Sequence, residues 1–223
     1  MAIVGSSVVV GKIAVARLPV FLLSGLRFAV ASAILITLVA LLERPLPRLT
    51  RHDLGVLALQ SFVGIVALNV AGGGLETRGA WPLMGNFLVF GAVVGEAVFV
   101  VCSRVAAQRL PPLVVATAIS ALGFVMFLPM AALQMRAFPL SRLAPTDWTI
   151  VAYYGVLVTV VAFLLWARGV ARVPASTASV FTGVLPVSAL ALSHFVLGES
   201  ITTWHLVATA LVAAGIVTLA RAR

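Results

Sequence analysis

The chain carries very few charged residues and a single cysteine. Of its 223 residues, 9% are charged and 62% are hydrophobic, whereas a soluble domain has roughly 25% charged residues. So little polar surface could not cover a water-soluble globule of this size, which excludes an ordinary soluble domain. The lone Cys102 excludes an internal disulfide and a cysteine-based metal cluster. Lipid is therefore the natural solvent for most of this chain.

Long apolar runs, separated by short segments rich in proline, glycine and arginine, account for most of the length. A spanning helix needs about 20 apolar residues, so roughly eight would use the whole chain. In lipid each run must be helical, because no water is present to satisfy an open backbone. We expect spans near residues 1–16 (short), 20–42, 54–71, 82–103, 111–134, 148–167, 176–197 and 204–220. The predicted fold class is an all-α polytopic membrane protein with about eight transmembrane helices.

Basic residues outnumber acidic ones, 15 against 6, but they are spread thinly between the apolar runs. No basic stretch alternates with aromatics, so we predict no nucleic-acid partner and interpret them as topology signals and lipid head-group contacts. With loops alternating sides from an inside N-terminus, the inside holds Arg44, Arg48, Arg51, Arg104, Arg109, Arg168, Arg172, Arg221 and Arg223, and the outside holds Lys12, Arg17, Arg78, Arg136 and Arg142. This excess follows the positive-inside rule. We predict an inner-membrane, multi-pass protein with both termini cytoplasmic.

Two short motifs recur in the same order along the chain. Arg-Leu-Pro occurs at 17–19 and at 109–111, and Pro-Leu-x-Arg-Leu occurs at 45–49 and at 139–143. An aspartate follows each copy of the second motif, and the later one, Asp147, is expected to cap the helix that begins at Trp148. The first copy of this motif falls inside and the second outside. The repeats are therefore predicted to be inverted relative to the membrane, as in many secondary transporters.

The two predicted repeats differ in length. Residues 1–71 supply an incomplete first repeat of three helices, 72–81 form a linker, and 82–220 supply a complete second repeat of five helices. The first helix, up to Lys12, would be about 16 Å long, against a hydrocarbon core of about 30 Å. We therefore interpret the chain as a ten-helix bundle that lacks two helices and half of another.

Several segments resemble the EamA family of the drug/metabolite transporter superfamily. The residues that carry the resemblance are 168–176, Leu185-Pro186 and Leu197-Gly198-Glu199 in the second repeat, and Gly5-Ser6-Ser7, Pro19 and Arg27 in the first. The resemblance implies a ten-helix carrier built from two inverted five-helix repeats, which exports amino acids and other small metabolites. Against that pattern, the first repeat here lacks its fourth and fifth helices and Val4 replaces the usual tryptophan.

Two charged residues are candidates for binding a substrate. Glu96 is expected about 12 Å from the helix end that Arg104 marks, where a charge costs about 2.5–3.5 kcal/mol. It should face a wet cavity, pair with a base or stay protonated, so it is either a substrate-amine or proton site or a structural glutamate. Arg27 lies about eight residues into its helix. It holds a substrate carboxylate, snorkels to the outer interface or pairs with a helix end.

The remaining candidates are less specific. Tyr154 and Trp166 either line a cavity or anchor helix ends at the interface. Pro186 interrupts the helix at 176–197, and it either frees backbone groups for a substrate or produces a packing kink. Gln60 and Thr159 are interpreted as hydrogen-bonding groups between helices. No metal-ligand spacing and no phosphate-binding glycine loop occurs, so we predict no metal site, no cofactor and no enzyme activity.

Two interpretations of function follow. The first is a transporter of small, amino-acid-like metabolites that works by alternating access around a midplane site, with Glu96, Arg27, Tyr154, Trp166 and Pro186 as candidate binding residues. The second is a truncated, transport-inactive membrane remnant or interaction protein, which the incomplete first repeat motivates. The partners are then a small molecule and the bilayer. Copies associating to replace the missing helices would make a homo-oligomer.

Overall fold

A computed structural model describes residues 2–43, 47, 49–71, 82–198, 200, 202, 203, 207, 209–212, 214, 215 and 218. The described elements are α1 (Ala2–Val15), α2 (Val20–Leu42), α3 (Arg51–Ala71), α4 (Pro82–Ala107), α5 (Pro112–Ala137), the 3-10 turn η1 (Leu140–Arg142), α6 (Pro145–Ala152), the π-helical segment η2 (Tyr153–Val161), α7 (Ala162–Arg172), α8 (Ala175–Thr182) and α9 (Val184–Leu197). Seven of the eight expected spans thus appear as helices. The eighth, 204–220, and the linker 72–81 fall largely outside the described residues.

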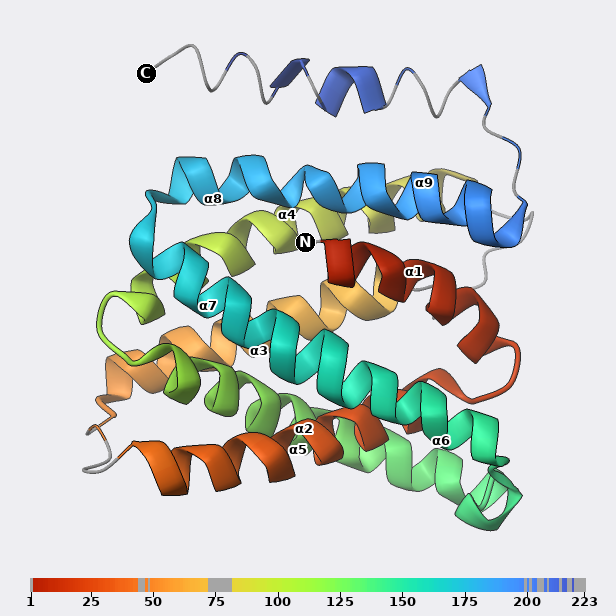
Figure 1. The fold of residues 1–223 in the computed structure, drawn as a ribbon, viewed down its shortest axis with the longest axis horizontal. Helices are drawn as coiled ribbons and strands as arrows, with labels where there is room; N and C mark the ends of the chain where they lie inside the picture. The colour runs from red at the N-terminus through yellow and green to blue at the C-terminus, as the bar shows by residue number, and fades with distance from the viewer. Residues whose placement is uncertain are drawn as a thin grey trace.

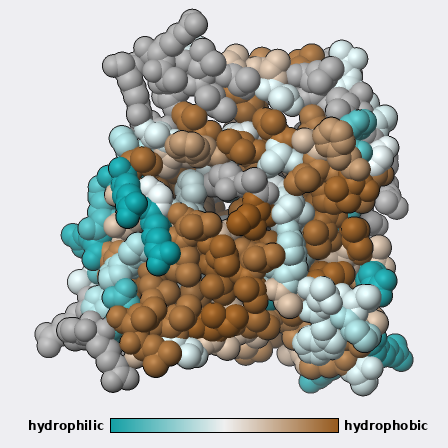
Figure 2. Space-filling view, in the orientation of Figure 1, coloured by the Kyte–Doolittle hydropathy of each residue, from teal (hydrophilic) through white to brown (hydrophobic). Residues whose placement is uncertain are grey.

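Among the described residues, four helical stretches are long and apolar enough to cross a membrane: Val20–Leu42, Pro112–Ala137, Pro145–Arg172 and Val180–Leu197, with Ile3–Val15 as a shorter apolar helix. The helix α2 runs from right to left in Figure 1, α3 from left to right, α4 from right to left and α5 from left to right. The continuous α6–α7 stretch then runs from right to left, and α8 and α9 run from left to right. Apolar side chains cover much of the middle of the face in Figure 2, and hydrophilic ones gather toward its edges. This is the surface that a polytopic membrane protein presents to lipid and to water.

Two spans differ in detail from the sequence-based expectation. The helix expected to be capped by Asp147 begins earlier, at Pro145, with Ala144 as the N-cap. Asp147 is its third residue, and its Oδ2 accepts the N–H of Ala144 at 2.9 Å. The span at 176–197 is interrupted at Gly183, three residues before Pro186. Proline is tolerated there because the N–H groups in the first turn of a helix have no acceptor within that helix. A residue without an N–H therefore loses no hydrogen bond at this position.

The helices that correspond in the two predicted repeats, α2 and α5, pack against each other, and their contact needs small residues. A Cβ atom added at Gly25 of α2 would lie 2.6 Å from the Cβ of Ala131 in α5. A Cβ added at Gly123 of α5 would lie 3.0 Å from the ring of Phe28. Small residues let helix backbones approach closely, which is how helices associate in lipid. The α2–α5 contact is thus set by side-chain size at a few positions.

Two ion pairs join the predicted repeats at opposite ends of the bundle. Arg17, after α1, donates through Nε to Asp147 Oδ1 at 2.8 Å and through Nη2 to Thr146 at 3.0 Å. Arg109, after α4, lies 3.6 Å from Asp53 Oδ1 at the start of α3. Figure 1 places the end of α1 and the start of α6 at the right, and the end of α4 and the start of α3 at the left. Each arginine of one repeat therefore meets the aspartate of the other.

Candidate functional site

The helices of both predicted repeats enclose a cavity of about 520 Å³. Residues from α1 to α5, η2, α7, α8 and α9 line it, and most of them are apolar. The polar side chains in its wall are Ser7, Arg27, Gln60, Ser61, Glu96, Thr159 and Trp166. A volume of about 300–1,000 Å³ with apolar walls and a few placed polar groups is typical of a small-molecule site.

Arg27 of α2 brings a guanidinium to the wall of this cavity. Its Cζ lies 4.5 Å from the ring centroid of Phe28 and 5.8 Å from that of Tyr154. Its Nε is buried and has no hydrogen-bond partner among the described residues. Aromatic faces stabilise a cation without using its N–H donors. The guanidinium is therefore held in place while its Nε–H donor stays unpaired.

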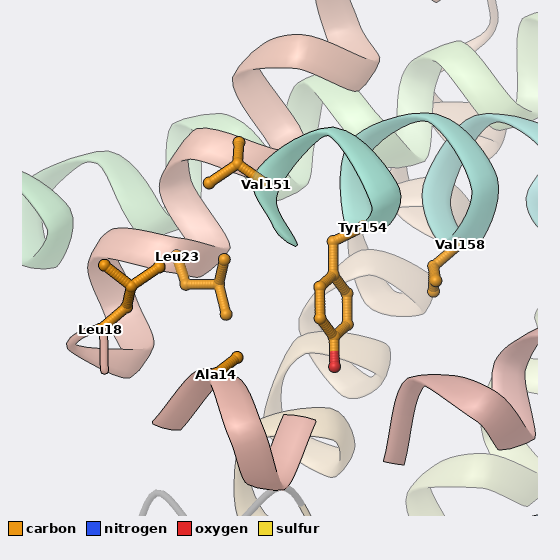
Figure 3. Packing of buried hydrophobic residues seen from close by; sticks show 6 residues of the cluster. All are labelled: Ala14, Leu18, Leu23, Val151, Tyr154 and Val158. Atoms are coloured by element: carbon orange, nitrogen blue, oxygen red, sulfur yellow. The ribbon is translucent and has the colours of Figure 1, made fainter. Parts of the chain in front are cut away.

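Tyr154 stands behind Arg27 rather than in the wall itself. Its side chain is 6% exposed and packs in a cluster with residues of α1 and α2. Figure 3 shows its ring extending from the η2 helix past Leu23, with the hydroxyl at the far end. That hydroxyl donates to the backbone carbonyl of Ser7 in α1. Tyr154 thus ties η2 to α1 and supports Arg27 through its ring.

Glu96 of α4 lies in the same cavity wall as Arg27. It is partly buried, and no ion pair or hydrogen bond involves it within the described part of the chain. A carboxyl group in a predominantly apolar wall lacks the compensation that buried charges ordinarily have. Three environments were expected for Glu96: a wet cavity, a paired base or a protonated carboxyl group. Glu96 lines the cavity, and no base pairs with it among the described residues.

Gln60 of α3, Ser103 of α4 and Trp166 of α7 form a hydrogen-bonded cluster at the cavity. Gln60 Nε2 donates to Ser103 Oγ at 2.6 Å, and Trp166 Nε1 donates to the same oxygen at 3.2 Å. Gln60 and Trp166 line the cavity, and Gln60 is 0% exposed. Its Oε1 has no hydrogen-bond partner among the described residues. This cluster joins three helices and leaves one acceptor unused.

The structure therefore brings Arg27, Glu96 and Trp166 into one cavity and places Tyr154 next to it. The side chain of Pro186 lies outside the described residues, although its backbone belongs to α9. Gln60 was interpreted from sequence as an ordinary interhelical hydrogen-bonding group. Its spacing from Asp53 equals the spacing of Tyr154 from Asp147, which is the one signal in the sequence that could have singled it out.

Secondary transporters bind their substrates in cavities between membrane helices. The sequence model of the EamA-like transporter family matches residues 83–221, which is more than half of the chain. The chain belongs to the EamA-like transporter family, as its motifs predicted. It is a multi-pass membrane transporter and not an enzyme.

Individual relatives agree with this placement. The uncharacterized transporter YetK of Bacillus subtilis (strain 168) is 36% identical over 273 aligned positions, which cover 97% of this chain and 83% of that protein. The uncharacterized transporter YyaM of the same organism is 25% identical, covering 71% of this chain and 52% of that protein. A solved structure described as "Crystal structure of protein" matches with a TM-score of 0.58 at 17% identity, over 98% of this chain and 93% of that one. This last likeness concerns the fold alone.

Proposed function

We propose that this transporter carries small, amphipathic, amino-acid-like metabolites by alternating access. One observation carries the proposal: a guanidinium with an unpaired donor and a carboxyl group, neither with a partner among the described residues, share a predominantly apolar cavity. Arg27 supplies N–H donors for a substrate carboxylate, for which its planar fork is suited. Glu96 receives the substrate ammonium, and the apolar wall receives the substrate side chain.

Alternating access is supported by the two ion pairs between the repeats. The motifs that place Arg17 and Arg109 after corresponding helices also place Asp147 and Asp53 at corresponding helix starts. The two pairs are thus equivalent contacts at opposite ends of the bundle. A carrier that opens one end at a time needs equivalent contacts that close in turn. We infer that these pairs hold the two ends closed.

The pairs are unequal in this structure. The Arg17 end is closed by a 2.8 Å contact, whereas the Arg109 end has a separation of 3.6 Å. The cavity lining includes Val173, which follows α7 and lies toward the Arg109 end. This supports a state closed at the Arg17 end. By the positive-inside rule, the Arg109 end would face the cytoplasm, together with both termini.

Opposite changes in cavity access are the expected outcome when the pairs are broken singly. With Cys102 replaced by serine and a cysteine at Gly169 in the cavity wall, Arg17→Gln should slow labelling by a maleimide from the Arg109 end, and Arg109→Gln should accelerate it. Both arginines are about half exposed, and ion pairs open to water contribute little, so each shift should not exceed about fivefold. Arg142→Gln, an exposed change at the Arg17 end, is the control. Equal labelling rates in the two variants would contradict the inference.

A second candidate function is a transport-inactive membrane protein. It is favoured by the alignment with YetK, which runs over 273 positions although this chain has 223 residues, so at least 50 positions of that relative have no counterpart here. This supports the proposal that residues 1–71 form a first repeat without its fourth and fifth helices. Transport by purified protein separates the two functions.

The deciding experiment reconstitutes the full chain in liposomes loaded with the twenty standard L-amino acids and follows their efflux by mass spectrometry. We expect efflux of at least one amino acid, and we expect Glu96→Gln to abolish it while the protein stays folded. Glu43→Gln is the matched control, because Glu43 follows the end of α2 and does not line the cavity. Unchanged efflux with Glu96→Gln would reject the role of Glu96, and no efflux at all would favour the inactive protein.

A further inference from the structure

We infer that Gln60 is a specificity-determining residue whose amide oxygen accepts a hydrogen bond from the ammonium group of the substrate. The inference rests on the proposed function and adds a residue to it. Gln60 lies in α3, within the first repeat, and so gives that shortened repeat a direct part in recognition.

The orientation of Gln60 is set by the protein. Ser103 Oγ receives both the Gln60 Nε2–H and the indole N–H of Trp166, at 2.6 and 3.2 Å. With Nε2 facing Ser103, the other terminal atom, Oε1, is turned away from this cluster. The side chain is 0% exposed and lines the cavity. An amide held by one end in a cavity wall presents its other end as a fixed acceptor.

The Gln60 Oε1 acceptor is buried but unpaired within the described structure, whereas most buried polar atoms in proteins have a hydrogen-bond partner. Gln60 Oε1 has no partner in the described part of the chain, whereas the hydroxyl of its neighbour Ser61 donates to the carbonyl of Leu57 at 2.8 Å. A buried polar atom without a hydrogen bond is costly, because it has lost water and gained nothing in exchange. A ligand with a donor group would supply the missing bond.

The charges around the cavity indicate which donor fits. Gln60 Oε1 and the Glu96 carboxyl group are acceptors, and Arg27 supplies donors. A substrate with an ammonium and a carboxylate matches this division. The second repeat has Tyr154 at the position equivalent to Gln60, and its hydroxyl is already bonded to Ser7. Of these two equivalent positions, only Gln60 has an unpaired acceptor among the described residues, and this difference gives a polar substrate one preferred orientation.

The test measures binding to the full-length protein in detergent by thermal shift. The probes are the twenty standard L-amino acids, their amides, which lack the carboxylate, and their N-acetyl derivatives, which lack the ammonium. Gln60→Met keeps the length of the side chain and removes its hydrogen bonds. We expect it to weaken the amino acids and the amides about tenfold, since a hydrogen bond to a charged group is lost, and to leave the N-acetyl derivatives unchanged.

The control variant is Ser120→Ala. Ser120 is likewise 0% exposed with an unpaired Oγ, but it does not line the cavity, so probe affinity should not change. Equal weakening of amino acids and N-acetyl derivatives by Gln60→Met would overturn the inference, because the amide would then act on the carboxylate. Unchanged affinities with Gln60→Met, alongside weakening by Glu96→Gln, would overturn it while the proposed function stands. If no probe binds the wild-type protein, the proposed substrate class and the inference fall together.

Discussion

Replacing Arg27 by leucine is expected to lower amino-acid efflux by roughly a hundredfold without lowering the melting temperature. The loss follows from removing the charged hydrogen bonds to a substrate carboxylate, each of which contributes about 1.5–3 kcal/mol. Stability should be kept because the guanidinium is buried next to two aromatic rings without an acidic partner among the described residues. Replacing an unpaired buried charge by an apolar group of similar volume is often neutral or stabilising.

Lost efflux with an unchanged melting temperature would distinguish a substrate-binding role of Arg27 from a purely structural one. If Arg27 only supported the packing of Phe28 and Tyr154, Arg27→Leu would lower the melting temperature and efflux together. Arg27→Lys provides the matched comparison, because it keeps the charge but loses the planar fork, and it should retain part of the efflux. Efflux assays in liposomes and thermal melts in detergent measure the two quantities. Full efflux with Arg27→Leu would contradict the proposed role.

Gly25→Val is expected to destabilise the protein by about 3 kcal/mol. Even a single Cβ at this position would lie 2.6 Å from the Cβ of Ala131, an atom that cannot rotate away. The α2 and α5 helices would have to separate, and their contact lies close to Phe28 and the cavity. A lower melting temperature in detergent, measured with the wild-type protein alongside, checks the prediction.

Two further variants show whether the cause is this contact. Adding Ala131→Gly removes the opposing methyl group and should restore at least part of the lost stability. Gly91→Val introduces the same side chain in α4, where an added Cβ would meet nothing within 4 Å, so stability should change little. If Gly91→Val were as damaging as Gly25→Val, the effect would come from the helix itself rather than from the approach of α2 and α5.

The helices were predictable from sequence because an apolar segment in lipid must pair its backbone N–H and C=O groups internally, which an α-helix does. The span expected at 20–42 is the helix Val20–Leu42, and the others agree within a few residues at most ends. Arg27 and Glu96 were predictable for a related reason: a charged group inside an apolar span is costly and needs an explanation. The family could be recognised because its motifs are present between residues 168 and 199, within the part of the chain that the family model matches.

Other features depend on packing that the sequence does not display. Arg17 and Arg109 belong to one repeated motif, and Asp53 and Asp147 follow the two copies of the other. Only the tertiary structure shows that each arginine meets the aspartate of the other predicted repeat. Gln60 is an ordinary neutral residue until Ser103 fixes one end of its amide and burial isolates the other. The π-helical turn at Tyr153–Val161 has no proline to announce it, and the Thr159 hydroxyl bonds the carbonyl of Tyr154 within it.

That π-helical turn has a mechanical consequence. It divides the 28-residue span Pro145–Arg172 into two arms, one carrying Asp147 at the ion pair and the other carrying Trp166 in the cavity wall. π-Helical turns interrupt the regular hydrogen-bond pattern of an α-helix and often occur at functional sites. We therefore expect Asp147 to separate from Arg17 by a movement of the shorter arm about this π-helical segment. The longer arm, which carries Trp166, can stay in place. A bound substrate would then keep its contacts with this arm while the Arg17 end of the bundle opens.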